Sequence, residues 1–240
     1  MADAGRSSGA AGVGRWLSRA ALWAADYAVI TAWQLRGLLA PGDADRYRAG
    51  RAGAAPVVLV PGIYETWSVF RRVAGVLHDH GHPVHPVPTL GYNHGPVSEM
   101  AQRAARLMTD LDLHDVVLVA HSKGGLIGKA VMLDPLVGPR VSGMVAVNAP
   151  FAGSRYASWL PLPSVRALAP RHPSVLELAA QQEVNHRITS VFPEFDPHVP
   201  GGSRLPGGCN VEIATTGHFR TLAHPEVLDA VLDGVRRHAR

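Results

Sequence analysis

Apolar and polar residues alternate in blocks over residues 56–240. Short continuous apolar runs, such as PVVLVPG at 56–62 and DVVLVAH at 115–121, are separated by stretches whose apolar residues recur at helical spacing. Continuous apolar runs of this length are typical of strands that are buried on both faces of a parallel sheet. The pattern therefore predicts an α/β fold with about six mostly parallel strands and helices on both faces.

The same pattern gives expected boundaries for each element. We expect strands at residues 56–62, 83–88, 115–121, 141–150, 187–192 and 209–216. We expect helices at residues 67–80, 97–112, 123–134, 173–184 and 224–238, and an irregular, proline-rich stretch at 151–172. No internal repeat is visible, which favours a single domain over residues 56–240.

Residues 15–40 form a separate, strongly apolar pattern that predicts an amphipathic helix. Its polar side chains share one narrow side at helical angle, and they are Arg15, Ser18, Arg19, Asp26 and Arg36. Asp26 lies near the centre, where it would cost a membrane-spanning helix about 2.5–3.5 kcal/mol. A clean uncharged core of a secretory signal is also missing. Two interpretations remain open: a helix docked on the domain, and a helix lying in a membrane interface, which its tryptophans suit.

The remaining segments and the length complete the predicted organisation. Residues 1–14 are small and polar, so we expect them to be disordered, and residues 41–55 have the composition of a linker. The chain has 240 residues, of which 47% are hydrophobic. A domain at 56–240 of this composition is large enough to bury a core of good size.

Charge and cysteine content exclude several classes of protein. The net charge is +4 and the calculated isoelectric point is about 9.6, but the arginines are scattered and lysine occurs only at Lys123 and Lys129. No basic stripe is present, so we expect no nucleic-acid partner. Cys209 is the one cysteine, which excludes an intrachain disulfide and a zinc site built on several cysteines. We expect a cytoplasmic location, with residues 15–40 as a candidate peripheral membrane contact.

The junction between the strand at 115–121 and the helix at 123–134 carries the main chemical signal. Ser122 stands in the sequence Ala-His-Ser-Lys-Gly, with small residues two positions before and after it, Ala120 and Gly124. Small residues relieve the crowding where a strand turns sharply into a helix, as in a nucleophile elbow. The helix start also places backbone N–H groups near the serine. The alternative is an ordinary turn with a serine cap.

Three further stretches make this turn part of a larger resemblance. With LVPGIYETW, FDPHVPGGSRLPG and TTGHF, the chain resembles small bacterial lipases and esterases of the α/β-hydrolase superfamily over most of residues 56–240. The order Ser, Asp, His along the chain is the order of that superfamily. The helix at 15–40 lies outside the resemblance. The two strands that open larger members have no counterpart, so the resemblance implies a minimal form of the fold.

The resemblance and the predicted topology select the base and the acid. A base must lie beyond the carboxyl end of a strand, and His218 follows the last expected strand, with Gly217 giving the backbone freedom to turn. Asp196 belongs to DPHVP, which resembles the acid turn of the family, and Glu194 is the reserve candidate. A surface acid that caps its own turn is the alternative for Asp196. HDHGH at 78–82 is interpreted as a solvated helix end, not as a metal site.

The resemblance also implies an oxyanion hole made by the backbone N–H groups of Lys123 and Ile63. The family more often has His-Gly before the second donor, where this chain has Pro61-Gly62. The candidate substrate-binding residues are Tyr64, Trp67, Phe151 and Trp159, and each has core packing as its alternative.

Together these residues predict a serine carboxylic-ester hydrolase that acts on lipid or other hydrophobic esters through Ser122, His218 and Asp196. The chemistry requires no metal and no organic cofactor. One alternative is an acyltransferase or thioesterase that uses the same three residues. The other is a non-catalytic scaffold on the same fold.

Overall fold

A six-stranded sheet forms the centre of the domain. The computed structural model describes residues 7–40 and 43–239, and within the first helix it describes side chains from Ala21 onward. The strands are β1 (Val57–Val60), β2 (Val84–Pro86), β3 (Val116–His121), β4 (Val141–Val147), β5 (Ile188–Phe195) and β6 (Cys209–Thr216). Their order is β2-β1-β3-β4-β5-β6, and every neighbouring pair is parallel. The predicted sheet is confirmed.

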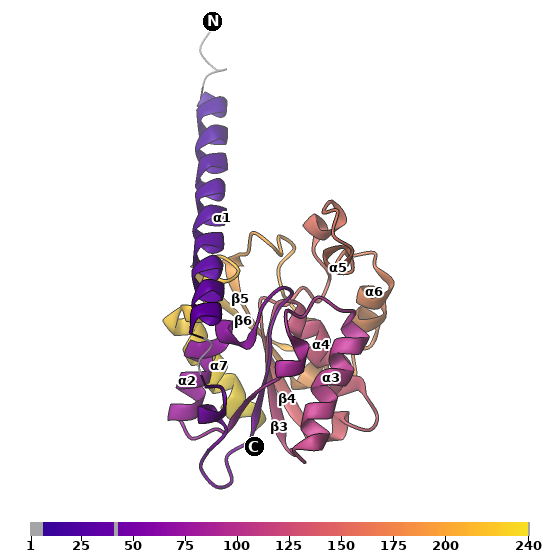
Figure 1. Cartoon of the computed structure of the whole chain (residues 1–240). Helices are drawn as coiled ribbons and strands as arrows, with labels where there is room; N and C mark the ends of the chain where they lie inside the picture. Colours follow the sequence, from indigo (N-terminus) through magenta and orange to yellow (C-terminus); the bar gives the residue numbers. More distant parts are fainter. Residues whose placement is uncertain (1–6, 41–42, 240) are drawn as a thin grey trace, which may run out of the picture.

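Helices cover both faces of this sheet (Figure 1). The α-helices are α1 (Ser7–Leu39), α2 (Arg71–Asp79), α3 (Val97–Asp110), α4 (Lys123–Leu133), α5 (Pro163–Arg166), α6 (Pro173–Ala180) and α7 (Pro225–His238). Helices α3, α4 and α6 pack on one face, and α1, α2 and α7 pack on the other. The predicted fold class, an α/β sheet with helices on both faces and an added N-terminal helix, is confirmed.

The continuous apolar runs have the structural role that their pattern predicts. Every residue of β1 and β3 is buried. Side chains alternate across a strand, so Val58 and Val60 pack toward α3 and α4, whereas Val57 and Leu59 pack toward α2 and α7. A strand that contacts two helical layers needs apolar residues at every position.

Helix α1 starts earlier than the sequence predicts. It begins at Ser7 instead of residue 15, so residues 7–14, expected to be disordered, continue the helix; residues 1–6 lie outside the described residues. Extending an existing helix is far easier than starting one, which accounts for the longer span. The C-terminal half of α1 lies along the domain, and its N-terminal half projects beyond it (Figure 1). Among the described residues, no helix combines the length and apolar character needed to cross a membrane.

The described side chains of α1 dock the helix on the domain. Ile30 is buried in the core on the side of α2 and α7, and Asp26 is completely buried. The expected linker also packs: the 3-10 helix Asp45–Tyr47 buries Tyr47 against Trp67 and His78.

Parallel strands bring their carboxyl ends to one edge of the sheet, and the loops that follow them gather there. The loops after β1, β3, β5 and β6 carry the candidate chemical residues of the sequence analysis. The stretch at 151–172, expected to be irregular, contains the 3-10 helix Arg155–Ser158 and the short helix α5.

Candidate active site

Ser122 occupies a strained turn between β3 and α4. Its φ and ψ are 52° and −124°, a backbone conformation that residues other than glycine rarely adopt. Hydrogen bonds hold it on both sides: its N–H donates to Val147 O at 2.9 Å, and its carbonyl accepts from Gly125 N–H at 2.9 Å. The strain is therefore maintained by the surrounding sheet and helix.

Gly124 makes this sharp turn sterically possible. A Cβ added there would lie 2.1 Å from Val60 O, because the first turn of α4 crosses directly over the end of β1. Such a contact is far below any van der Waals separation, so no larger residue fits without moving backbone. Gly124, two positions after Ser122, therefore relieves the crowding between the strand and the helix, as the motif predicts.

His218 and Asp196 form a buried pair at the ends of β6 and β5. Nδ1 of His218 lies 2.7 Å from Oδ2 of Asp196, and both side chains are about 3% exposed. The other carboxylate oxygen accepts the backbone N–H groups of His198 at 2.7 Å and Val199 at 3.0 Å. Glu194, the reserve candidate, is exposed. Backbone N–H groups of the same loop thus orient Asp196, and Asp196 orients the imidazole of His218.

The charges around His218 favour its protonated form. Burial disfavours the imidazolium, but the charge and hydrogen bond of Asp196, together with the charges of Glu65 and Asp26, outweigh burial, so the pKa of His218 is raised above its ordinary value. For Asp196, burial works in the other direction and is outweighed by His218 and the backbone donors, so its pKa is lowered. An Asp that stays ionised beside a basic imidazole is what general-base catalysis needs.

His121 turns away from Ser122, as expected, and forms a buried pair with Glu65. Nδ1 of His121 lies 2.8 Å from Oε1 of Glu65, and its Nε2 lies 3.2 Å from the backbone carbonyl of His218. A carbonyl oxygen only accepts, so Nε2 of His121 carries a proton. The Nδ2 group of Asn148 donates to the same carbonyl at 2.6 Å. Thr221 Oγ1 donates to it as well, at 2.6 Å, so three buried side chains bind the carbonyl of His218.

The side chain of Lys123 braces the loop between β2 and α3, which in turn contacts the loop after β1. It is almost fully buried, and Nζ donates to Asn93 O at 2.8 Å and to Gly95 O at 2.5 Å. Asn93 in turn donates through Nδ2 to Pro61 O at 2.6 Å. Burial lowers the pKa of Lys123 to about 8 against the opposing charge of Glu99. Sequence reasoning assigned Lys123 only a backbone role, so this brace was missed.

Ser122 and His218 line one apolar cavity of about 310 Å³. Ile63 and Glu65 also line it, after β1, as do residues of the 151–172 stretch. Helix α1 contributes the remaining aromatic wall through Trp23 and Tyr27. Sequence reasoning missed both side chains because α1 lies outside the resemblance to known lipases and esterases.

The expected substrate-binding residues divide between this cavity and other places. Trp159 lines the cavity and is 87% exposed at its rim. Phe151 is buried in the core on the side of α3 and α4, and Trp67 packs on Tyr47 on the other face. Tyr64 is 42% exposed, its hydroxyl lies 2.6 Å from Ser164 Oγ, and it is not among the residues that line the cavity. Phe151 and Trp67 therefore take the packing alternative, whereas Tyr64 neither lines the cavity nor packs in the core. Apolar and aromatic side chains carry no directional signal in the sequence that would separate these cases.

His198 is a neutral aromatic element of the cavity. Its ring lies 4.3 Å from Trp23 and 4.7 Å from the ring of His218, measured between centroids. Burial, and next the charge of His218, lower the pKa of His198 to about 3. The ring therefore contributes shape and polarity without carrying a charge at neutral pH.

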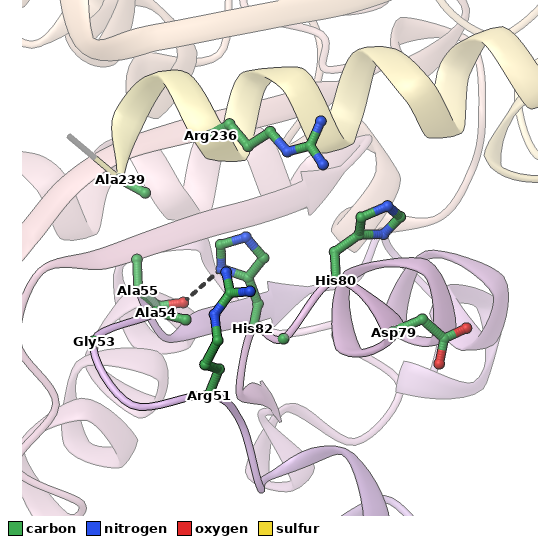
Figure 2. Close-up of a pocket in the computed structure, with 10 residues that line it drawn as sticks. Arg51, Gly53, Ala54, Ala55, Asp79, His80, His82, Arg236 and Ala239 are labelled. Atoms are coloured by element: carbon green, nitrogen blue, oxygen red, sulfur yellow. Dashed lines mark hydrogen bonds between the residues drawn. The ribbon is translucent and has the colours of Figure 1, made fainter.

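Two groups of histidines have side chains of the kind that bind metal ions. Potential ligand atoms of Asp196, His198 and His218 lie within 4.8 Å of one another, but the first and last already share a hydrogen bond. HDHGH lies at the opposite, amino end of the sheet. Figure 2 shows His80 and His82 around a pocket that they share with Arg51, Arg236 and Asp79, so two arginines outnumber the one acid there. An excess of positive charge disfavours a metal ion.

Solved structures of known proteins share this architecture. A putative non-heme bromoperoxidase, BpoC from Mycobacterium tuberculosis, aligns over 80% of this chain and 94% of its own, with a TM-score of 0.59 and 16% identity. A monoacylglycerol lipase from Paleococcus ferrophilus aligns over 77% of this chain and 96% of its own, with a TM-score of 0.55 and 17% identity. A thermophilic esterase from Thermogutta terrifontis aligns over 78% of this chain and 91% of its own, with a TM-score of 0.53 and 16% identity.

The sequence itself matches no family model and no curated protein. The likeness in three dimensions is nevertheless extensive, since it covers nearly the full length of proteins described as hydrolases, lipases and esterases. The chain adopts the α/β-hydrolase fold, in the minimal six-stranded form that the sequence predicts.

Proposed function

We propose that this protein is a serine carboxylic-ester hydrolase acting on hydrophobic esters. One observation carries the proposal: a serine on a strained strand-to-helix turn and a histidine paired with a buried aspartate face the same apolar cavity. Lipases and esterases among the structural neighbours support the same reaction class. Neither a metal nor a cofactor enters the mechanism.

The first half of the reaction forms an acyl-enzyme. Nδ1 of His218 donates to Asp196, so the neutral ring presents Nε2 as the acceptor. Nε2 takes the proton of Ser122 as Oγ attacks the ester carbonyl, and Asp196 stabilises the resulting imidazolium. When the tetrahedral intermediate collapses, the alcohol leaves with that proton and the acyl group stays on Ser122.

The second half releases the acid. A water molecule gives a proton to His218 as its oxygen attacks the acyl carbonyl, and the proton returns to Ser122 when the acid departs. In both halves the backbone N–H groups of Lys123 and Ile63 stabilise the oxyanion. The Lys123 brace to Asn93 and Gly95 supports this role, because it holds the two donor-bearing loops together.

The cavity indicates the substrate class. Its lining is mainly apolar and aromatic, and its volume of about 310 Å³ lies at the small end of ligand sites. We infer an ester with a hydrophobic acyl group of modest length. A water-soluble p-nitrophenyl ester is therefore a suitable first probe.

The test compares wild type with Ser122→Ala and, as a matched control, Ser98→Ala. Ser98 is an exposed serine on α3. The first variant is expected to lose about 10⁴-fold or more of its kcat for p-nitrophenyl butyrate, and the control to match wild type. Wild type is also expected to react with a fluorophosphonate at Ser122. An unlabelled, inactive wild-type protein would instead favour a scaffold, and acyl transfer to an added alcohol or thioester cleavage in preference to ester cleavage would favour the other alternative.

A further inference from the structure

A carboxylate of the N-terminal helix reaches into the candidate active site. Asp26 of α1 is completely buried, and Oδ2 accepts the backbone N–H of His218 at 2.6 Å. Oδ1 accepts the N–H groups of Phe219 and Arg220, each at 3.1 Å. One side chain thus binds three consecutive backbone donors, and the first belongs to the residue assigned as the base.

These contacts explain why an acid is tolerated in an apolar helix. A buried carboxylate is very costly unless hydrogen bonds or an opposite charge compensate for lost water. Among the described residues, the one ion-pair contact of Asp26 within 4 Å is with Nδ1 of His198, at 3.8 Å from Oδ2, and that ring is neutral. The three backbone N–H groups therefore provide the compensation, and both carboxylate oxygens are used.

With the bond to Asp26, the N–H, the carbonyl and the side chain of His218 are all hydrogen-bonded. The carbonyl of His218 is bound by Asn148, His121 and Thr221, and its side chain is bound by Asp196. Its N–H is bound by Asp26, 192 residues away in sequence. Gly217, with a φ of 117°, gives this loop extra backbone freedom, which hydrogen bonds to His218 must restrict. The hydrogen bond to Asp26 is the one of these restraints that comes from α1.

We propose that Asp26 is a positioning residue for His218, which makes the N-terminal helix a working part of the ester-hydrolase site. The inference rests on the proposed function. It goes beyond it because α1 has no place in the resemblance to lipases and esterases. Asp26 acts through the backbone of the loop and does not touch the substrate.

Asp26 also acts on His218 through its charge. The charged or titratable groups that face the His218 ring come from four segments, and they are Asp26, Glu65, His121, Asp196 and His198. Asp26 is one of the negative groups that favour the imidazolium. An anchor that only attached α1 to the domain would affect stability, but it would not alter the protonation of the base.

The experiment compares Asp26→Asn with Thr31→Asn in the full chain. Asn at 26 keeps the size of the side chain but loses the charge and one acceptor, whereas Thr31 is exposed on the same helix. We expect kcat for p-nitrophenyl butyrate to fall about 10- to 100-fold in Asp26→Asn, with KM changed less than about threefold. The acid limb of the kcat/KM profile moves to lower pH. Thr31→Asn retains wild-type values.

A second variant and a second readout keep the test decisive. Asp26→Glu retains the charge and both acceptors, so the acid limb stays at the wild-type pH even if kcat falls. Hydrogen exchange measures the loop without catalysis: the amides of 218–220 exchange at least about tenfold faster in Asp26→Asn than in Thr31→Asn.

Three outcomes separate this inference from the proposed function. Wild-type activity and an unchanged pH profile in Asp26→Asn overturn the inference and leave the hydrolase intact. A wild-type protein that hydrolyses no ester overturns the proposed function and, with it, the catalytic part of the inference. Unchanged exchange at 218–220 in a folded Asp26→Asn overturns the positioning role in every case.

Discussion

The imidazole of His218 and the carboxylate of Asp196 are joined at 2.7 Å, although the two residues follow different strands. The remaining oxygen of Asp196 is held by two backbone N–H groups of its own turn. The pair is therefore rigid, and it selects one tautomer of the imidazole, with Nδ1 protonated and Nε2 available.

Replacing Asp196 tests this relationship. Asp196→Asn keeps the shape of the turn but offers His218 an amide, which favours the wrong tautomer and removes the charge that stabilises the imidazolium. We expect kcat to fall about 10³- to 10⁴-fold at neutral pH. The matched control is Glu194→Gln, at an exposed position two residues earlier. A large loss in the control, or wild-type activity in Asp196→Asn, would show that the acid was wrongly assigned.

The pH dependence of hydrolysis follows from the raised pKa of His218. The ring must be neutral to accept the serine proton, and Asp196, opposing burial, stabilises the charged form. Activity is therefore lost as pH falls through a pKa above the ordinary 6.5 of histidine. His198, with a pKa of about 3, adds no second transition near neutrality. Initial rates at low substrate from pH 5 to 9 measure the limb, and a midpoint well below 6.5 would contradict the assignment.

Gly124 permits the close approach of α4 to β1, so a single methyl group tests the turn. In Gly124→Ala the new Cβ meets Val60 O at 2.1 Å, and we expect a loss of about 2–4 kcal/mol in the free energy of unfolding. Gly75→Ala on α2 is the control, because nothing lies within 4 Å of its added Cβ. That variant is expected to gain about 0.5–1 kcal/mol from helix propensity. Urea denaturation of both proteins compares the two effects, and equal stabilities would contradict the close approach.

The aromatic wall from α1 predicts an effect on substrate preference. Trp23 lines the cavity beside His198, whereas Trp67 packs on Tyr47 and is not among the residues that line the cavity. Trp23→Ala is expected to lower kcat/KM for p-nitrophenyl hexanoate about tenfold relative to the acetate, because apolar contact with the acyl chain is lost. In Trp67→Ala the ratio of the two esters stays constant, although stability falls. A chain-length series on both variants measures the ratio.

Much of the fold could be predicted because its signal is local. Buried parallel strands need an apolar residue at every position, and the runs around Val58 and Leu118 show this directly. Ser122, Asp196 and His218 could be proposed because each follows a strand and carries a distinctive neighbour, such as Gly124 or Gly217. The resemblance to lipases and esterases added the pairing, which no spacing in the chain reveals.

The rest depended on contacts between distant segments. Asp26 looked like a cost to an apolar helix, since its three partners lie more than 190 residues away. Tyr64, Trp67 and Phe151 have side chains that suit a pocket or a core equally well, and only the packing decides between the two. The side-chain role of Lys123 was hidden because its acceptors are backbone carbonyls of a loop with no recognisable motif.

The meeting of α1 with the loop of His218 has a consequence for synthesis of the protein. Asp26 and the first backbone amide that it accepts from are 192 residues apart in the chain. Closing a contact over such a separation has a higher entropy cost than closing a local one, and contacts of this kind slow folding. The helix is therefore synthesised long before its partner loop, and the candidate site is assembled only when both segments have been made.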